Sequence, residues 1–351
     1  MLSRIFALFL AAVICNGVRA ADPPSESWTF TLRFENDLFN STDRFYTNGV
    51  KLNWISPELD WFEDLNWVKR TPMLLETVTY LTSILQIRDD ELTQHNLSVS
   101  LGQQIYTPRD ITVAEIIPDS RPYAGWLYSS IGFHNKNFRE LESFELQLGF
   151  TGKWSLAHQA QDLVHSIRNI PKAQGWSNQI KTEPGIVLVY ERKYRLVPHI
   201  GIAGGWGADA IMHLGGTLGN ISTYLNSGIE LRTGWKIPTD FGSALIRPGG
   251  DTNAPVDTMD VRFRDDPTEV SAYIFVATTG RLVARDIFLD GNTFAHSHRV
   301  ERQNIVADLI IGGSVIYKRF KLSYAHVLRT REFEAQPGGH DFGSMSLSFT
   351  Y

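Results

Sequence analysis

The strongest pattern along the chain is an alternation of apolar and polar side chains that predicts a β-hairpin near the start. Four apolar residues occupy every second position of the outgoing segment: Trp28, Phe30, Leu32 and Phe34. Three more do so on the returning segment: Val50, Leu52 and Trp54. A period of two residues is typical of strands that have one apolar face. The sequence therefore predicts two antiparallel strands joined by a polar loop.

The same alternation recurs along the rest of the chain. It marks segments at residues 97–102, 124–134, 144–150, 186–194, 199–213, 224–235, 270–285, 305–317, 320–331 and 342–351. Several segments approach the roughly ten residues that a tilted membrane strand needs. The last one ends the chain on Tyr351, as the terminal strand of an exported barrel does. The pattern predicts an all-β fold, a transmembrane antiparallel β-barrel of about twelve strands.

The first residues predict a signal peptide. Arg4 precedes a short apolar run that ends at Cys15, and Val18-Arg19-Ala20 has the small residues of a cleavage site. Residues 1–21 are therefore expected to be removed, which leaves residues 22–351 as one barrel with its active-site rim on the extracellular side. Cys15 is the only cysteine of the chain, so no disulfide is expected in the mature protein.

Composition narrows the class of protein. The net charge is −5 and there is no basic run, so nothing favours a nucleic-acid partner. An exported chain of alternating segments without a long apolar run is either a soluble β-sandwich or an outer-membrane barrel. Aromatic residues near strand ends favour the barrel, because they resemble interface girdles. These residues are Trp28, Trp54, Trp126, Tyr190, Tyr194, Trp206 and Trp235.

The sides of the membrane follow from counting strands from a periplasmic N-terminus. The extracellular loops are then residues 36–45, 106–122, 152–182, 214–222, 286–302 and 332–341, and turns such as 195–198 are periplasmic. The sequence suggests no function for two long periplasmic turns, residues 56–95 and 236–268. The first of them is compatible with a helix that begins at Pro72.

The third extracellular loop has the spacing of a short helix, capped by Ser155 and ending near Arg168. Its polar side carries Gln161 and His165, which are four residues apart and share one face. The simplest interpretation of this side is a solvated face on a helix that caps the barrel.

A second polar cluster falls on the same end of the predicted barrel. Asn36 and Asp37 follow the first strand, and Thr47 opens the second. Asn-Asp at a strand end is often turn chemistry, because both side chains bond their own backbone. The strand count nevertheless places this cluster beside the loop helix, although the two are far apart in the sequence.

The two clusters together carry the groups for ester hydrolysis. Carboxylate and amide oxygens bind hard cations such as calcium, and a histidine can act as a general base towards water. A metal-bound carbonyl oxygen is stabilised as an oxyanion, so no serine nucleophile is required. The chain has no Gly-x-Ser-x-Gly motif to supply one. His296 and His298 lack further ligands at zinc spacing and are interpreted as loop histidines.

Further motifs are spread over nearly the whole mature chain. They are Phe34-Glu-Asn-Asp37, Asp43-Arg-Phe-Tyr-Thr-Asn-Gly49, Gln104-Ile-Tyr-Thr-Pro108, residues 119–126, Gly175-Trp-Ser-Asn-Gln179, Glu183-Pro-Gly185 and Leu289-Asp-Gly-Asn-Thr-Phe294. Together they resemble the outer-membrane lipid A 3′-O-deacylase family, the LpxR-like proteins. The resemblance implies a twelve-stranded barrel in the outer membrane of a Gram-negative cell. It also implies calcium-dependent hydrolysis of the ester-linked 3′ acyl chains of lipid A, the lipid part of lipopolysaccharide.

The resemblance also implies roles for the two polar clusters. Asn36 and Asp37 match the family's Asn-Asp pair, which is implied to hold calcium or to orient the base. His165 matches the histidine of the loop helix and is implied to activate water. Thr47 and Gln161 match positions that hold substrate or water. One departure concerns the phosphates of lipid A, because the family's basic stretch is replaced by residues 109–118, where only Arg109 is basic.

Two rival functions are compatible with the same pattern. A non-enzymatic channel or adhesin would lose no lipid product when His165 is replaced, and a channel would conduct ions. An outer-membrane phospholipase would differ from a lipid A deacylase in its substrate. The sequence alone does not choose the lipid A variant, the acyl-chain preference or the oligomeric state.

Overall fold

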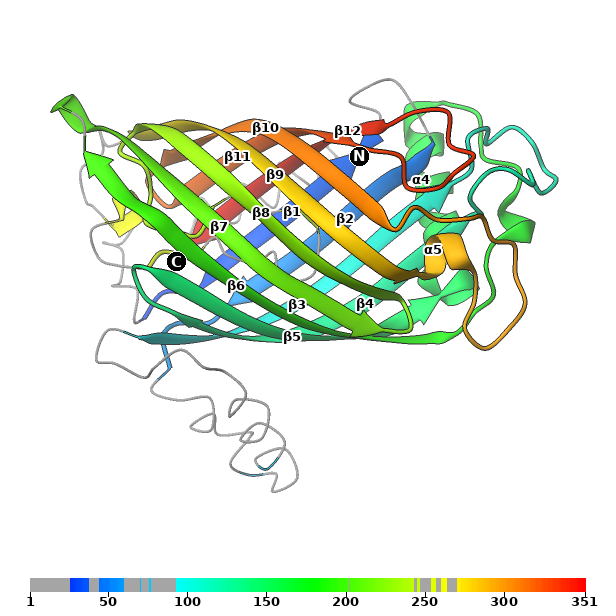
Figure 1. Ribbon diagram of the computed structural model, residues 1–351, viewed down its shortest axis with the longest axis horizontal. Coiled ribbons are helices and arrows are strands. Elements are labelled where there is room, and N and C mark those ends of the chain that lie inside the picture. The colour runs from blue at the N-terminus through cyan, green and yellow to red at the C-terminus, as the bar shows by residue number, and fades with distance from the viewer. Residues whose placement is uncertain are drawn as a thin grey trace.

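Twelve antiparallel strands close into a barrel (Figure 1). They are β1 (Thr29–Asn36), β2 (Phe45–Ile55), β3 (Gln94–Thr107), β4 (Ala124–Lys136), β5 (Glu140–Thr151), β6 (Pro184–Gly201), β7 (Trp206–Gly219), β8 (Ser222–Trp235), β9 (Val270–Asp286), β10 (Ile305–Tyr317), β11 (Phe320–Arg329) and β12 (His340–Thr350). Each strand pairs with its neighbours in sequence, and β1 pairs with β12 to complete the ring. The predicted fold is confirmed.

The computed structural model describes residues 26–37, 44–59, 70, 76, 93–201, 203–242, 245–246, 254–256, 260–263 and 270–351. The predicted signal peptide at residues 1–21 and the predicted helix after Pro72 lie outside these residues, so both stay predictions. Within the described chain, no helix is long and apolar enough to cross a membrane. The helices are α4 (Ala157–Arg168), α5 (Ile287–Asp290) and the short 3-10 helices η3 (Gly152–Ser155), η4 (Trp176–Asn178), η5 (Ala203–Gly205) and η6 (Val261–Phe263).

The predicted hairpin is present, and its alternation separates the two faces of the wall. Leu32 pairs with Leu52, and Phe34 pairs with Val50. These apolar side chains point outward, while the alternate residue Arg33 is buried in the lumen. Closure of the ring satisfies the backbone hydrogen bonds of every strand, which a bilayer requires of any structure that crosses it.

The connections alternate between the two ends of the barrel. One end, called here the α4 end, carries Asp37, Arg44 and residues 108–123, 152–183, 220–221, 287–304 and 330–339. The opposite end, called here the terminal end, carries Trp28 and Tyr351, which exchange two backbone hydrogen bonds of 2.7 and 2.9 Å. The described parts of the predicted extracellular loops lie at the α4 end. The loop predicted at residues 214–222 is shorter than expected, because β7 continues to Gly219 and β8 begins at Ser222.

An aromatic girdle surrounds the terminal end. Its half-exposed members are Trp28, Trp206, Trp235, Tyr317 and Tyr351. The prediction that Trp126 belongs to a girdle is wrong. Trp126 is buried in the lumen and stacks on Tyr128, with ring centroids 5.7 Å apart. Its position in the alternation of β4 turns it inward, and composition alone cannot distinguish the two faces.

The predicted turn at residues 195–198 is also wrong. Strand β6 continues through it to Gly201, with register shifts beside Val197 that accommodate Pro198 in the ladder. The chain turns instead at η5, where Gly204 and Gly205 have φ angles of 79° and 85°. Only glycine adopts this left-handed conformation without strain.

The long connection between β8 and β9 folds back into the lumen. The amide of Ile246 donates a hydrogen bond of 2.6 Å to the carboxylate of Glu35 on β1. The guanidinium of Arg33 reaches the carbonyl oxygen of Leu245 at 3.4 Å. The described parts of residues 236–263 therefore form a plug inside the barrel, a role that the sequence did not reveal.

Charged pairs anchor the plug to the wall. Asp240 of the plug accepts hydrogen bonds from Arg232 of β8 at 2.8 Å and from Lys321 of β11 at 2.6 Å. Arg262, further along the plug, reaches the same carboxylate at 3.3 Å. All four side chains are buried. The plug is thus fixed to β8 and to β11, which are separated by two strands in the ring.

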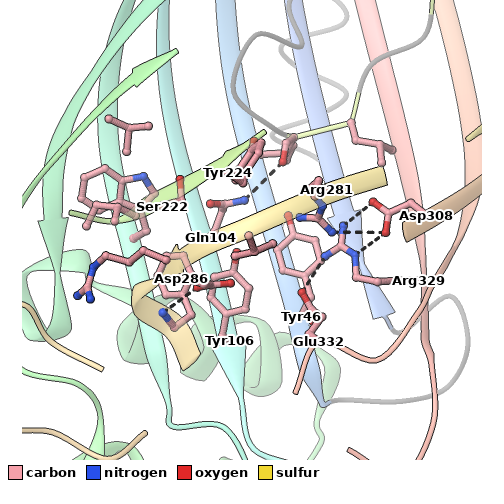
Figure 2. Close-up of a pocket in the computed structure, with 18 of the residues that line it drawn as sticks. Tyr46, Gln104, Tyr106, Ser222, Tyr224, Arg281, Asp286, Asp308, Arg329 and Glu332 are labelled. Carbon is pink, nitrogen blue, oxygen red and sulfur yellow. Dashed lines mark hydrogen bonds and ion pairs between the residues drawn. The ribbon is translucent and has the colours of Figure 1, made fainter. Parts of the chain in front are cut away.

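Between the plug and the α4 end, the lumen contains a hollow lined by charged and aromatic side chains (Figure 2). The charges are paired with one another: Arg329 donates to Asp308 at 2.8 Å, and it lies 3.4 Å from Glu332. Tyr106 stacks on Phe288 with centroids 4.2 Å apart. The hollow is thus surrounded by a tightly cross-linked interior, and neither of the two predicted clusters contributes to its lining.

Candidate active site

Helix α4 lies on the outer face of the barrel wall, against β3 and β4. Ala157 of the helix packs in one buried cluster with Ile105 of β3. Ile105 stands between the lumen-lining residues Gln104 and Tyr106, so its side chain points outward. On β4, a Cβ added to Gly125 would lie 2.3 Å from the Cβ of Ala157. The helix therefore covers the outside of the wall instead of capping the barrel mouth.

Gly125 is a point where α4 can be displaced without touching the predicted site. Gly125→Val is expected to push α4 off the wall, because the first added carbon already overlaps Ala157 and lies 2.2 Å from the Oγ of Ser155. The measurement is modification of His165 by an imidazole reagent, which should become faster in the variant. Gly338→Val is the matched control, since nothing lies within 4 Å of a Cβ there. Unchanged modification in Gly125→Val would contradict this packing.

The start of α4 differs from the prediction, whereas its end agrees. Ser155 belongs to η3, where its hydroxyl donates to the carbonyl oxygen of Gly152 at 2.6 Å. The residue that precedes the helix is Leu156, in the left-handed region with φ 57°. The predicted cap by Ser155 is therefore wrong, because that hydroxyl is already committed. The helix ends at Arg168, as predicted.

The helix buries its polar side. Gln161 and His165 are 4% and 2% exposed, whereas Leu163 and Ile167 are 59% and 47% exposed. The interpretation of the polar side as a solvated face is wrong for these two residues. Such burial of a glutamine and a histidine requires hydrogen-bond partners for both.

A backbone carbonyl orients His165. Its Nδ1 lies 2.6 Å from the carbonyl oxygen of Pro171. A carbonyl oxygen only accepts hydrogen bonds, so Nδ1 carries the proton and donates it. In the neutral ring the lone pair is then on Nε2. The imidazole is held in the tautomer that a general base needs, with its basic nitrogen on the far side from Pro171.

An indole orients Gln161. The Nε1–H of Trp176 donates a hydrogen bond of 2.7 Å to the Oε1 of Gln161. Because an indole can only donate, this bond fixes the amide oxygen and turns the amide N–H groups away from Trp176. Trp176 is buried and packs on Tyr123 with centroids 4.9 Å apart. The sequence showed Trp176 as part of a motif, but nothing in the pattern indicated its partner.

The other cluster gathers at the tip of the first hairpin. Asn36 is the last residue of β1, opposite Asn48 of β2, and points outward because its neighbour Glu35 points into the lumen. Asp37 is fully buried and accepts a hydrogen bond of 2.6 Å from the amide of Arg44. A side chain that bonds nearby backbone is what the simpler interpretation of the Asn36-Asp37 pair, as turn residues, predicts.

Thr47 links the hairpin to the strand that supports α4. It lies at a register shift between Tyr46 and Asn48, and its hydroxyl is 2.7 Å from that of Thr107 on β3. Neighbouring strands are about 5 Å apart, so β2 and β1 lie roughly 5 and 10 Å across the sheet from β3. The predicted residues thus form two groups at one end of the wall: Asn36, Asp37 and Thr47 on the hairpin, and Gln161 and His165 on α4.

The side-chain oxygens of the hairpin group are of the chemical type that calcium prefers as ligands. Within the described residues, no three His, Cys, Asp or Glu side chains are grouped to hold a metal ion. Calcium, however, also takes neutral oxygens among its roughly six to eight ligands. Asp37 offers a carboxylate and Asn36 an amide oxygen, both buried at the same strand end. Such a mixed oxygen set suits a hard cation and excludes one that prefers sulfur or nitrogen ligands.

Glu183 ties together two loops at the α4 end. Its carboxylate accepts hydrogen bonds from the Nδ2 of Asn292 at 2.9 Å and the amide of Thr293 at 3.0 Å. Partial burial raises the pKa of this carboxyl, but the hydrogen bonds outweigh burial and hold the pKa below its usual value. Glu183 therefore stays ionised and keeps the connection after β9 docked beside β6. Two motifs noted in the sequence meet at this contact.

Comparison with solved structures supports the barrel architecture. LpxR from Salmonella typhimurium has a TM-score of 0.68 and 16% identity, and the match covers 92% of this chain and 99% of that chain. At this identity the likeness shows the fold alone. The beta domain of the Bordetella autotransporter Brka has a TM-score of 0.41 and 9% identity, with coverages of 95% and 99%. A TM-score of this size carries no argument about the present chain.

Comparison with protein families gives a more specific result. No curated protein matches the chain. The family described as "Outer membrane protein LpxR" matches residues 5–351, which includes both predicted clusters and all twelve strands. The chain therefore belongs to the LpxR family of outer membrane proteins, which are lipid A deacylases.

Proposed function

We propose that the protein hydrolyses the ester-linked 3′ acyl chains of lipid A, with water activated by His165 and with calcium as cofactor. Membership of the LpxR family supports lipid A deacylation in the outer membrane as the general activity. The finer assignment rests on one observation, the hydrogen bond from Nδ1 of the buried His165 to Pro171. A histidine held in this way has a single basic nitrogen, directed away from the bond.

The chemistry follows from the two groups of residues. Nε2 of His165 takes a proton from water as the water oxygen attacks the carbonyl carbon of the ester. The bond from that carbon to the sugar oxygen then breaks, and the imidazolium returns the proton to the leaving sugar oxygen. The products are a carboxylic acid and a lipid A with a free 3′ hydroxyl. Gln161, with its amide N–H groups turned away from Trp176, and Thr47 orient the water or the ester.

Calcium has a defined place in this scheme. Asn36 and Asp37 would hold it by their side-chain oxygens. When bound, it supplies positive charge that stabilises the oxyanion of the tetrahedral intermediate. Asp37 is the only acidic residue in the hairpin group, so it is expected to dominate the affinity.

The position of the site suits a substrate that stays in the membrane. His165 and Gln161 lie between α4 and the outer face of the wall, so β3 and β4 separate them from the lumen. A lipid of the outer leaflet therefore reaches the site from the side, without passing through the barrel. A soluble ester would not need a site that faces the membrane.

Segment 109–118 offers the phosphate groups of lipid A a single cation. Arg109, the basic residue of segment 109–118, is paired with Asp119 at 2.8 Å, and both side chains are exposed. A carboxylate competes with a phosphate for such a guanidinium. We therefore expect the preferred lipid A to carry fewer phosphates, or to be bound through other parts of the molecule.

Mass spectrometry of lipid A from cells that express the protein tests the proposal. The expected result is loss of the 3′ acyl mass in the wild type, and no loss with Asp37→Ala. Purified protein should release the same acid with calcium and none with a chelator. Release that persists in the chelator would remove calcium from the scheme. Cleavage of phospholipid vesicles with lipid A left intact would favour the phospholipase.

A further inference from the structure

Four residues of α4 are placed in the opposite way to those of a helix on a soluble protein. Such a helix turns its apolar side to the core and its polar side to water. Here the buried side carries Gln161 and His165, while Leu163 and Ile167 are turned away from the protein. Leu163 and Ile167 are four residues apart, so they form one ridge along the helix.

The apolar ridge extends beyond the helix. Trp154 of η3 and Leu156 are 62% and 50% exposed, and both precede the ridge in the chain. The residues of this surface, called here the apolar lip, are Trp154, Leu156, Leu163 and Ile167. A monomeric soluble protein rarely leaves large apolar side chains together in water.

The apolar lip is continuous with the lipid-facing wall of the barrel. The ring of Trp154 meets that of Phe150, edge to face, with centroids 5.0 Å apart. Phe150 and Leu148 point outward from β5, and Leu148 pairs with the exposed Ile186 of β6. The wall of an outer-membrane barrel is already covered by acyl chains. The surface that continues this wall onto α4 therefore begins in contact with lipid.

The cations that flank the apolar lip, and the tryptophan within it, favour contact with the edge of a leaflet over contact with a protein partner. Lys153 precedes the lip and Arg168 follows it, and both are exposed. Basic residues that flank an apolar ridge are typical of helices that lie in the interface, where they meet anionic head groups. Tryptophan is enriched at the same depth. A protein partner would explain neither the flanking cations nor the continuity with the wall.

We propose that the apolar lip is immersed in the outer leaflet, where its four side chains contact the acyl chains of membrane lipids. Helix α4 then lies at the edge of the leaflet, with Gln161 and His165 against the wall and Leu163 and Ile167 in hydrocarbon. Its exposed polar flank, which includes His158 and Gln159, faces the head groups. The space between α4 and the wall opens into the membrane. This inference does not depend on the reaction that takes place there.

Depth-dependent quenching of a label tests the immersion. Cys15→Ser gives a cysteine-free chain, into which Leu163→Cys and Ile167→Cys are introduced separately and labelled with the environment-sensitive dye NBD. Leu148→Cys on β5 is the lipid-facing control. Glu334→Cys is the water-facing control, because Glu334 is an exposed charged residue of the connection before β12. The full-length proteins are reconstituted in phosphatidylcholine vesicles that contain lipids with a spin label high on the acyl chain.

The expected result is a blue-shifted emission at positions 163 and 167, quenched by the spin-labelled lipid as strongly as at position 148 and protected from aqueous iodide. Iodide quenching equal to that at position 334 would place the lip in water and overturn the proposal. Protection from both quenchers would show that protein covers the lip, and would overturn it as well. Because the replaced side chains are exposed, folding is expected to be unaffected, and Trp154→Cys provides an independent third position.

Discussion

His165→Ala is expected to reduce the rate of lipid A deacylation by about 10²–10⁴-fold, the usual contribution of a general base. The substitution removes the only nitrogen base of the buried face of α4, while the contact between Ala157 and Ile105 that seats the helix remains. The carbonyl of Pro171 loses a hydrogen bond, but it lies in a connection that water can reach. The measurement is the release of acid from purified lipid A, in detergent and with calcium present. A drop in kcat with little change in KM is the expected form of the loss.

The matched control is His158→Ala on the same helix. The His158 side chain is half exposed, lies 3.6 Å from Asp162, and stacks on Trp176 from the outer side. Its loss should leave the rate within about twofold of the wild type, as for most exposed substitutions. Equal losses in both variants would mean that the helix is disturbed in general and that His165 has no special role. Full activity of His165→Ala would place the base elsewhere.

Asp240→Ala is expected to destabilise the barrel by about 3–5 kcal/mol, the range for breaking a buried charge network by removing one partner. The substitution removes the carboxylate that Arg232, Arg262 and Lys321 share, while Asp209 stays paired with Arg232 and Asp260 with Arg262. The buried cluster then has one negative charge fewer, so its cations repel one another more strongly where water is scarce. The measurement is the midpoint of urea unfolding in lipid vesicles, followed by tryptophan fluorescence.

Two further variants sharpen this result. Asp119→Ala breaks the exposed pair with Arg109 and should leave the midpoint unchanged, because exposed pairs contribute little. Asp240→Asn keeps the shape of the side chain but not its charge, and should be destabilised nearly as much as the alanine variant. If Asp240→Asn behaved like the wild type, hydrogen bonding alone would fix the plug, and the charge argument would fail.

The strands were predictable because the two faces of the wall meet different environments, which impose the alternation of apolar and polar residues. Hydrocarbon outside and a polar lumen inside force a period of two, which is visible at Leu32, Leu52 and Leu101. The same rule fails to say which face is which, so Trp126 was assigned to the girdle although it fills the lumen. The turn at η5 was missed for a related reason, since alternation continues through the bulge in β6.

The candidate site was predictable in its residues but not in its arrangement. The spacing of Gln161 and His165 marks a shared face, yet the usual rule sends a polar face to water. That rule assumes water on the outer side of the helix, and an outer-membrane protein has lipid there. The partners that orient the two side chains, Trp176 and the carbonyl of Pro171, follow only from folding of the loop in three dimensions.

The junction between the two terminal strands makes closure of the barrel depend on residues far apart in the chain. Strand β1 pairs with β12 from Thr29 opposite Thr350 to Asn36 opposite Gly343. Pairing across such a sequence separation is slow, so β1 is held only by its hairpin partner β2 until β12 joins it. An open edge strand is a template for pairing with another chain. Before the ring closes, the strand that carries Asn36 is therefore expected to be the part of the barrel most exposed to aggregation.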